Sequence, residues 1–487
     1  MKSIRLNISS HVVFALLLLA FVVSQACFLE ADPDISMATG SRAAWTDDGI
    51  LLCQVRNYLN GHGFDLLESD GFLKAPVYSF IQGSSMAVFG CDQVVARTTV
   101  LCLVVLSVLA LCLNTTSRPF AVVLLLSTFT LIPVHQHSHL ALAEMAAISF
   151  VLIAGLFLVK YFQESKPFWM LLSQLAILLT IGIKIQFLYL VISPALCWWV
   201  VTKTSDSYAN TRTNHMRMVV SSVIASFVLL MIYFMVFKEE WIVFQQAQSG
   251  SLLWDSISWD SFRNNCTAYL FRKKMTLFAL FFLISLIVFC NLIFNRNRRG
   301  IISVWSIFSL FWFLLELHKL PMDYLPMRYM VSFYMAMGLF SSAVLVDLWF
   351  AGLFPRIRAF SFGLLVLVSM VNVYVLARAY SERTYQLKSI QERIVLGLKQ
   401  DDVVVGPWAP ALTWGSKCRS FPVWSGFSSS DQIKRTGSPT VVMSEKGSLD
   451  SDFDWTDLLA GELEVVADSV TYSNIADWRV GVFWLNR

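Results

Sequence analysis

Two adjacent acidic residues, Asp47 and Asp48, follow an apolar N-terminal stretch in a chain that otherwise contains few charges. A carboxylate can take a proton from an attacking hydroxyl group. Two basic residues, Arg56 and Lys74, lie in the same segment, and such cations can stabilise the charge on a departing phosphate. These residue types therefore suit the transfer of a group from a phosphate to a hydroxyl.

The same segment also fits a purely structural interpretation. Thr46 is a good helix N-cap, and acids in a first helical turn offset the helix dipole. Apolar residues at helical spacing follow, so residues 46–60 predict an amphipathic helix lying on the external face of the membrane. Lys74 would then be an interfacial lysine whose charged end reaches the headgroups. The segment alone leaves both interpretations open.

Further along the chain, four polar residues lie at the ends of apolar segments. Glu144 lies one turn inside an apolar helix, and ionisable groups inside membrane helices tend to mark function. Lys184 separates two apolar runs, and Arg328 precedes Tyr329 at the start of another. Arginine can bind a phosphate through two parallel hydrogen bonds. Glu144 and Arg328 can equally lie at the headgroup level without a chemical role.

No metal site is predicted from the sequence, although a divalent metal ion stays an open alternative. His135, His137 and His139 alternate with Gln and Ser, and alternate spacing does not place all three on one helix face. The nine cysteines show no paired spacing typical of a zinc site. We therefore predict no cofactor.

The composition indicates a membrane protein. Of the 487 residues, 56% are hydrophobic and only 14% are charged, with a mean hydropathy of +0.62, whereas soluble domains contain about 25% charged residues. A spanning helix needs about 20 apolar residues, which predicts a polytopic α-helical protein with about 11 to 13 transmembrane helices. The candidate spans are 11–29, 98–113, 118–134, 140–162, 168–183, 184–201, 217–237, 275–294, 300–317, 329–349 and 357–379.

Clusters of Lys and Arg beside the spans predict the orientation, because such residues are enriched in cytoplasmic loops. The clusters at Lys2, 295–300 and 354–358 predict cytoplasmic ends there. Residues 45–76 and the chain after 379 then lie outside an inner (plasma) membrane. The N-terminal apolar run is interpreted as a retained helix in preference to a cleaved signal peptide.

Two short regions do not fit this predicted orientation simply. The segment 76–90 is apolar but too short for a full crossing, so we predict a re-entrant or partial helix. The basic residues 272–274 fall on the external side in this scheme, which argues against it.

The chain divides into two predicted domains. Residues 1–380 form the transmembrane domain, including an external loop at 30–76, and residues 381–487 form a soluble extracytoplasmic α/β domain. An amphipathic helix is expected within 383–400. The expected strands lie in DDVVVG, TVVMS, GELEVVAD and WRVGVFWL, with a short helix in DWTDLLAG. The expected role of this domain is structural, or to face an acceptor.

The order of motifs resembles the GT-C glycosyltransferases of the protein O-mannosyltransferase and aminoarabinose-transferase type. An acidic pair follows the first span, then come Arg-x-x-x-x-Gly-x-Gly, DGFLKAP, an FG turn and an Arg. The matching positions are Asp47, Asp48, Arg56, Gly61, Asp70, Gly71, Lys74, Pro76, Phe89, Gly90 and Arg97. More weakly, Glu144 resembles a second acid of the family, Lys184 the lysine of its T-K-G motif, and Arg328-Tyr329 its R-Y motif. The chain departs from the pattern at Asp48, Gly49 and Ile185.

The resemblance implies a membrane glycosyltransferase that moves a sugar from a polyprenyl-phosphate donor to an external acceptor. Asp47 or Asp48 would be the general base, with Asp48 favoured, and Glu144 would orient the acceptor or share the proton transfer. The residues implied in binding the donor phosphate are Lys74, Arg328, Arg56, Lys184 and Tyr329. The acceptor can be a lipid, a glycan or a protein, and no nucleic acid partner is expected. A transporter or lipid flippase without covalent chemistry is the alternative.

Overall fold

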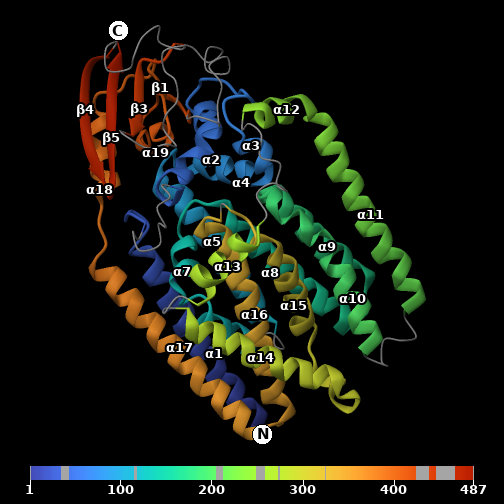
Figure 1. The fold of residues 1–487 in the computed structure, drawn as a ribbon. Helices are drawn as coiled ribbons and strands as arrows, with labels where there is room; N and C mark the ends of the chain where they lie inside the picture. The colour runs from blue at the N-terminus through green and yellow to red at the C-terminus, as the bar shows by residue number, and fades with distance from the viewer. Residues whose placement is uncertain are drawn as a thin grey trace.

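The computed structural model describes residues 2–33, 43–114, 118–204, 212–247, 258–271, 275–323, 325–423, 438–445 and 467–485. Helices form most of the molecule, and a mixed sheet lies at the C-terminal end (Figure 1). The prediction of a polytopic helical protein with a small C-terminal α/β domain is confirmed. Helices α2, α3 and α4 lie between the sheet and the long helices (Figure 1).

The helices of the larger part differ widely in length. They are α1 (Lys2–Ala26), α2 (Ala43–Leu59), α3 (Gly71–Lys74), α4 (Pro76–Phe89), α5 (Gln93–Leu113), α6 (Arg118–Ser127), α7 (Ile132–His137), α8 (Ala143–Glu164), α9 (Pro167–Ile183), α10 (Ser193–Thr204), α11 (Arg212–Val236), α12 (Lys238–Ala247), α13 (Trp259–Asn265), α14 (Thr276–Phe294), α15 (Val304–Glu316), α16 (Met327–Ala351) and α17 (Pro355–Ser381). Among the described residues, four short 3-10 or π segments accompany them: η2 (Ile185–Ile192), η4 (Cys266–Leu270), η5 (Arg296–Ile301) and η6 (Leu317–Lys319).

Within the described ranges, seven helices are long and apolar enough to cross a membrane, and three shorter apolar helices accompany them. The chain is therefore a multi-pass membrane protein. The seven long helices are fewer than the 11 to 13 expected, because apolar composition does not guarantee an unbroken helix. The expected span at 118–134, for example, is divided into α6 and the short α7, which begins beside Pro133.

Helix α4 occupies the segment predicted to be re-entrant. Its 14 residues extend over about 21 Å at 1.5 Å per residue, which is less than the roughly 30 Å of a bilayer core. It packs on α2, α5 and α9. A position partway into the membrane stays the prediction for this helix.

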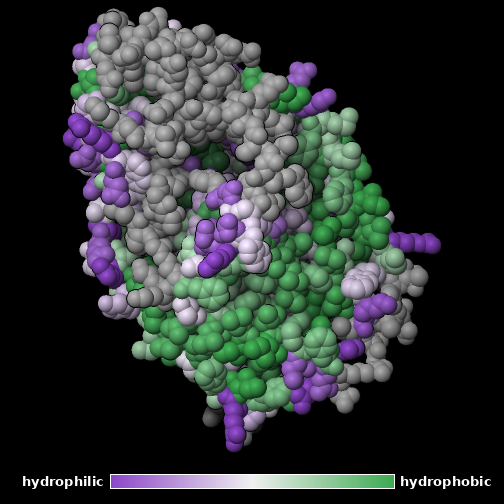
Figure 2. Space-filling model, in the orientation of Figure 1, coloured by the Kyte–Doolittle hydropathy of each residue, from purple (hydrophilic) through white to green (hydrophobic). Residues whose placement is uncertain are grey.

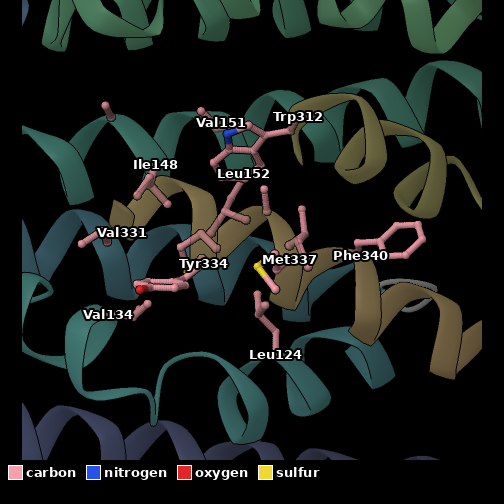
Figure 3. Close-up of a cluster of buried hydrophobic side chains, with 14 of the residues drawn as sticks. Leu124, Val134, Ile148, Val151, Leu152, Trp312, Val331, Tyr334, Met337 and Phe340 are labelled. Carbon is pink, nitrogen blue, oxygen red and sulfur yellow. The ribbon is translucent and has the colours of Figure 1, made fainter. Parts of the chain in front are cut away.

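Helix α16 lies at the centre of the hydrophobic core, and 89% of its most apolar stretch is buried. Val331, Tyr334 and Met337 lie among side chains of α6, α7, α8 and α15 (Figure 3), and Phe340 packs on Phe282 and Phe289 of α14. In contrast, α11 is only 17% buried. On the face seen in Figure 2, the coloured surface of the helical part is largely hydrophobic, as expected for helices that face lipid.

The C-terminal domain contains α18 (Gln386–Val395), β1 (Val403–Val405), α19 (Ala409–Leu412), β2 (Arg419–Phe421), β3 (Val441–Glu445), β4 (Ala467–Ile475) and β5 (Trp478–Leu485). The strand order is β2-β1-β3-β5-β4, parallel at β2-β1-β3 and antiparallel at β3-β5-β4. The strands expected in DDVVVG, TVVMS and WRVGVFWL are present as β1, β3 and β5. The expected helix DWTDLLAG and most of GELEVVAD lie outside the described residues.

Candidate active site

Helix α2 carries the acidic pair in its second turn. The helix begins at Ala43, so Thr46 lies inside it and neither Asp47 nor Asp48 belongs to its first turn. The expectation that Thr46 caps the helix and that the acids offset its dipole is therefore wrong. The acids have other partners, and these differ between the two residues.

The C-terminal domain packs against α2, a contact that the sequence did not predict, and the interfacial position of this helix stays a prediction. Along α2, Leu52, Cys53 and Asn57 are fully buried, and the helix packs against both α4 and α19. Gly49 lies against the backbone of Pro410, which a Cβ atom would overlap. The glycine that departs from the family pattern thus permits close contact between α2 and the C-terminal domain.

A cavity of about 150 Å³ lies where α2, α3, α8, α9 and α16 meet. Most of the polar residues singled out from the sequence surround it, although they come from distant parts of the chain. Its lining residues are Asp47, Ile50, Leu51, Asp70, Lys74, Ala75, Ala143, Lys184, Ile185, Gln186, Arg328 and Tyr329. Asp70 and Gln186 were not among the expected site residues, although Asp70 belongs to the DGFLKAP motif.

The charged groups at this cavity form pairs of opposite sign. The pairs are Asp47 with Arg328, Asp70 with Lys74, and Glu144 with Lys184. Nε of Arg328 also lies 3.8 Å from Oε1 of Glu144, so two of the pairs form one network. The cations Lys184 and Arg328 lie 5.3 and 5.1 Å from the centre of the Tyr329 ring. Three cations thus converge at one cavity, each matched by an acid.

Breaks between helices position these side chains. Lys184 follows the end of α9 in an extended conformation (φ −154°, ψ 111°), which separates α9 from η2. Glu144 lies in the first turn of α8. Arg328 lies in the first turn of α16, a helix that begins directly after Pro326. The first turn of a helix carries unpaired N–H groups and a partial positive charge. Both helix starts therefore favour an anion on this side of the molecule.

Asp48 points away from this cavity into a buried ion pair. Its Oδ2 lies 2.9 Å from Nε of Arg97, and the two side chains are only 1% and 2% exposed. Arg97 also donates hydrogen bonds of 2.9 Å to the carbonyls of Leu29 and Ala31. Asp47, in contrast, keeps 14% of its side chain exposed and lines the cavity. The structure thus separates the two acids, and Asp47 lines the cavity whereas Asp48, the residue favoured from the sequence, does not.

Arg56 is not among the residues that line the cavity and lies at the contact with the C-terminal domain. Its guanidinium donates to the carbonyls of Pro410 (2.6 Å) and Thr413 (3.1 Å) and lies 4.3 Å from the centre of the Trp414 ring. Burial lowers the pKa of Arg56. The structure therefore does not bring Arg56 together with the other residues expected to bind the donor phosphate, because all of these contacts belong to domain packing.

We expect Arg56→Ala to loosen the C-terminal domain without changing the affinity for a donor phosphate. The substitution leaves the buried carbonyls of Pro410 and Thr413 without their donor, which costs roughly 1–3 kcal/mol for each unsatisfied group. The melting temperature should fall, and hydrogen exchange should rise around α19. Arg393→Ala, at an exposed position of α18, is the control and should leave both unchanged. A weakened donor interaction with an unchanged melting temperature would restore the phosphate role.

A second buried polar cluster was not predicted from the sequence. Glu316 is fully buried and accepts hydrogen bonds from Tyr189, Trp312 (3.0 Å) and Ser332. It also pairs with Lys319 at 2.5 Å, and Lys319 donates to the backbone carbonyl of Tyr329 (3.1 Å). The only sequence signal was an acid and a base three positions apart beside an apolar run. This cluster holds the start of α16, which carries Arg328 into the cavity.

The three histidines have separate partners. His135 bonds to Ser24 (3.0 Å), and Nδ1 of His137 donates to the carbonyl of Pro133 (2.7 Å). His139 bonds to Gln25 (2.6 Å). Across the parts of the chain that the structure describes, no three His, Cys, Asp or Glu side chains are grouped to hold a metal ion.

Comparison with solved structures identifies the fold. The chain is similar to ArnT from Cupriavidus metallidurans in the apo state (TM-score 0.55, 15% identity) and bound to undecaprenyl phosphate (TM-score 0.52, 14% identity), in both cases over 96% of this chain and 97% of ArnT. It is also similar to archaeal oligosaccharyltransferase AglB from Archaeoglobus fulgidus (TM-score 0.46, 11% identity), over 96% of this chain and 74% of AglB. No family model and no curated protein matches the sequence.

The ArnT likeness extends over nearly the whole chain, so the membrane helices and the C-terminal domain both belong to the shared fold. The fold implied by the sequence motifs is thereby confirmed. The sequence match behind it is low, which is why the site residues must be argued from this chain's own geometry.

Proposed function

We propose that this protein is a membrane glycosyltransferase that moves a sugar from a polyprenyl-phosphate donor to an acceptor hydroxyl. The observation that carries the proposal is the convergence of Lys74, Lys184 and Arg328 with the partly exposed carboxylate of Asp47 around one cavity. The fold shared with ArnT, a protein whose structure is known with undecaprenyl phosphate, supports a donor of this class. The membrane setting suits a lipid-linked sugar.

In the proposed reaction, the acceptor oxygen attacks the anomeric carbon of the sugar, and the bond from that carbon to the phosphate oxygen breaks. Asp47 takes the proton of the acceptor hydroxyl. The electron pair leaves with the polyprenyl phosphate, whose charge is stabilised by Lys74, Lys184 and Arg328. Glu144 holds Lys184 in place and lies near enough to Arg328 to orient it.

The paired charges suggest how donor binding activates the base. Asp47 is paired with Arg328, and a nearby cation makes a carboxylate a weaker base because it stabilises the charged form. A donor phosphate would compete with Asp47 for Arg328. Asp47 would then be released to accept a proton only when the donor is present. Asp48 remains in its ion pair with Arg97 and serves as a positioning residue.

We further propose that the cavity and the C-terminal domain lie outside an inner (plasma) membrane. The end of the helical part that joins α14 to η5 and α16 to α17 carries Arg298, Arg299, Arg356 and Arg358. Basic residues beside membrane helices favour the cytoplasmic side, and the sheet lies at the opposite end of the molecule (Figure 1). An external site suits a lipid-linked donor, since that donor needs no nucleotide.

The function can be tested in a strain that lacks this protein. Lipid-linked and envelope glycans from the deletion strain should lack one sugar present in its parent, as measured by mass spectrometry. The wild-type gene should restore that sugar, and a gene with Asp47→Asn should not. Accumulation of a substrate in vesicles without covalent transfer, together with an unchanged glycan profile, would favour the transporter alternative.

We expect Lys74→Ala and Arg328→Ala to raise the KM for the donor by at least tenfold. Each substitution removes a charge-assisted contact to phosphate, and hydrogen bonds to charged groups contribute about 1.5–3 kcal/mol. Donor titrations in proteoliposomes measure the effect. Lys166→Ala, in an exposed pair with Glu164, is the matched control and should keep the wild-type KM. An unchanged KM in both site variants would contradict the phosphate role.

A further inference from the structure

A second cavity, larger than the one at Asp47, lies at the junction of α1, α7 and the end of α17. It measures about 250 Å³, and we name it the α7 cavity. Phe28, Ile132 and Ala379 supply apolar walls, and His135, Gln136 and His139 supply the buried polar ones. None of these residues has a role in the proposed sugar transfer.

Gln136 gives the α7 cavity unused hydrogen-bonding capacity. The side chain is only 5% exposed, and neither its amide nitrogen nor its amide oxygen has a hydrogen-bond partner among the described residues. A buried polar group left unsatisfied costs roughly 1–3 kcal/mol. A native protein seldom keeps two such atoms beside a cavity unless something in the cavity pairs with them.

His139 adds an acceptor beside this amide. The amide oxygen of Gln25 can only accept, so the 2.6 Å contact assigns the proton of His139 to Nδ1 and leaves Nε2 as an acceptor. The ring of His139 stacks on Phe28, with the centroids 5.6 Å apart. Burial lowers the pKa of His135 to about 3 and that of His139 well below its ordinary value. Both rings are therefore neutral at physiological pH.

The charged groups at the rim already have partners. Asp32 accepts hydrogen bonds from Thr384 (2.8 Å) and from the backbone N–H groups of Gln386 and Leu387. Arg383 donates to Tyr385 and to the carbonyl of Tyr380. Glu382 pairs with Arg378 at 2.8 Å. The α7 cavity therefore presents neutral donors and acceptors, an aromatic ring and apolar walls.

We propose that the α7 cavity binds a neutral, hydroxyl-bearing ring, the class of ligand to which single sugar residues belong. An amide offers a donor and an acceptor side by side, and neighbouring hydroxyls on a ring match both. The aromatic and aliphatic walls suit the C–H faces of such a ring. The volume lies below the roughly 300–1,000 Å³ of sites for drug-sized ligands, which limits the occupant to about one ring. This binding does not depend on the chemistry proposed for Asp47.

The α7 cavity is also connected to the acidic pair. Arg97 holds the carbonyls of Leu29 and Ala31, directly before Asp32 at the rim, and its Nε holds Asp48. The buried side chain of Arg97 therefore links the rim of the α7 cavity to Asp48 on α2. A sugar residue bound there would belong to a free glycoside or to a lipid-linked sugar.

The test uses the full chain in phosphatidylcholine nanodiscs, since sugar-based detergents would compete. Binding of methyl hexopyranosides and methyl pentopyranosides is measured by saturation-transfer NMR and by the shift in melting temperature. We expect at least one glycoside to bind wild type and Asp47→Asn equally, which separates this proposal from the catalytic one. Ala379→Trp fills the cavity and should abolish binding, whereas Ala377→Trp, on the exposed face of α17, should not.

A second variant guards against misfolding of the first. Gln136→Leu removes both amide groups at nearly constant volume and should weaken glycoside binding by roughly tenfold, in line with the loss of one or two hydrogen bonds. A glycolipid that binds more tightly than the free glycoside carrying the same sugar would identify the lipid-linked source. The proposal is overturned if no glycoside binds wild type, if binding survives in both Ala379→Trp and Gln136→Leu, or if glycerol 3-phosphate binds in preference.

Discussion

Asp47→Asn should lower the rate of sugar transfer by about 10²–10⁴-fold, the usual contribution of a general base. Asparagine keeps the size of the side chain and cannot accept the acceptor proton. Because the substitution also releases Arg328 from its acidic partner, the KM for the donor should stay the same or fall. The measurement is transfer from the polyprenyl-phosphate donor in proteoliposomes, with kcat and KM determined separately.

The adjacent residue provides the matched control. Asp48→Asn should lower the melting temperature, because it weakens the buried pair with Arg97, while the protein that remains folded keeps kcat within about tenfold of wild type. The assignment of the base would be contradicted by full activity in Asp47→Asn at normal protein levels. A large loss of kcat in Asp48→Asn with an unchanged melting temperature would transfer the role to Asp48.

The largest effect on stability is expected at Arg97. Arg97→Met removes the partner of Asp48 and the donor to the carbonyls of Leu29 and Ala31. Breaking one side of a buried ion pair typically costs 3–5 kcal/mol, so about that loss in the free energy of unfolding is expected. The melting temperature in micelles, followed by tryptophan fluorescence, measures it. Little folded protein should be recovered from membranes at growth temperature.

Two controls define this prediction. The double variant Arg97→Met/Asp48→Leu should be more stable than Arg97→Met alone, since it removes the charge that was left buried. Arg378→Met breaks an exposed pair with Glu382 and should change the free energy of unfolding by less than about 1 kcal/mol. Equal losses in Arg97→Met and in the double variant would show that lost packing, and not the unpaired carboxylate, is responsible.

Both predictions concern helix α2, in which one acid faces the cavity and the other holds the helix in place. Helix α2 presents Asp47 to the cavity, while Asp48 fixes the helix to α5 and to the end of α1 through Arg97. On another face, Gly49 and Arg56 hold the C-terminal domain against the same helix. A carboxylate on a helix that is fixed on several sides keeps its position relative to the cations of the cavity, and the proposed catalysis depends on such positioning.

The sequence by itself determined the class of fold and indicated most of the charged residues that meet at the candidate cavity. Apolar composition indicated the membrane setting, because an apolar segment of about 20 residues suits the bilayer core. In lipid such a segment forms a helix, which pairs all of its own backbone groups. The runs at β1, β3 and β5 were recognisable because β-branched residues cluster in them. Lys74, Lys184, Glu144 and Arg328 stood out as charges at the ends of apolar segments, where burial makes a charge costly.

The tertiary structure decided which of these residues act together. Neighbouring residues on a helix point about 100° apart, so only the packing around α2 could send Asp47 to the cavity and Asp48 to Arg97. Arg56 carries the same charge as Arg328, but its surroundings assign it to the C-terminal domain. The sequence likewise could not predict the unpaired amide of Gln136, because hydrogen-bond partners depend on which residues surround the side chain in the folded protein. Residue types limit the chemistry, and long-range packing selects the site.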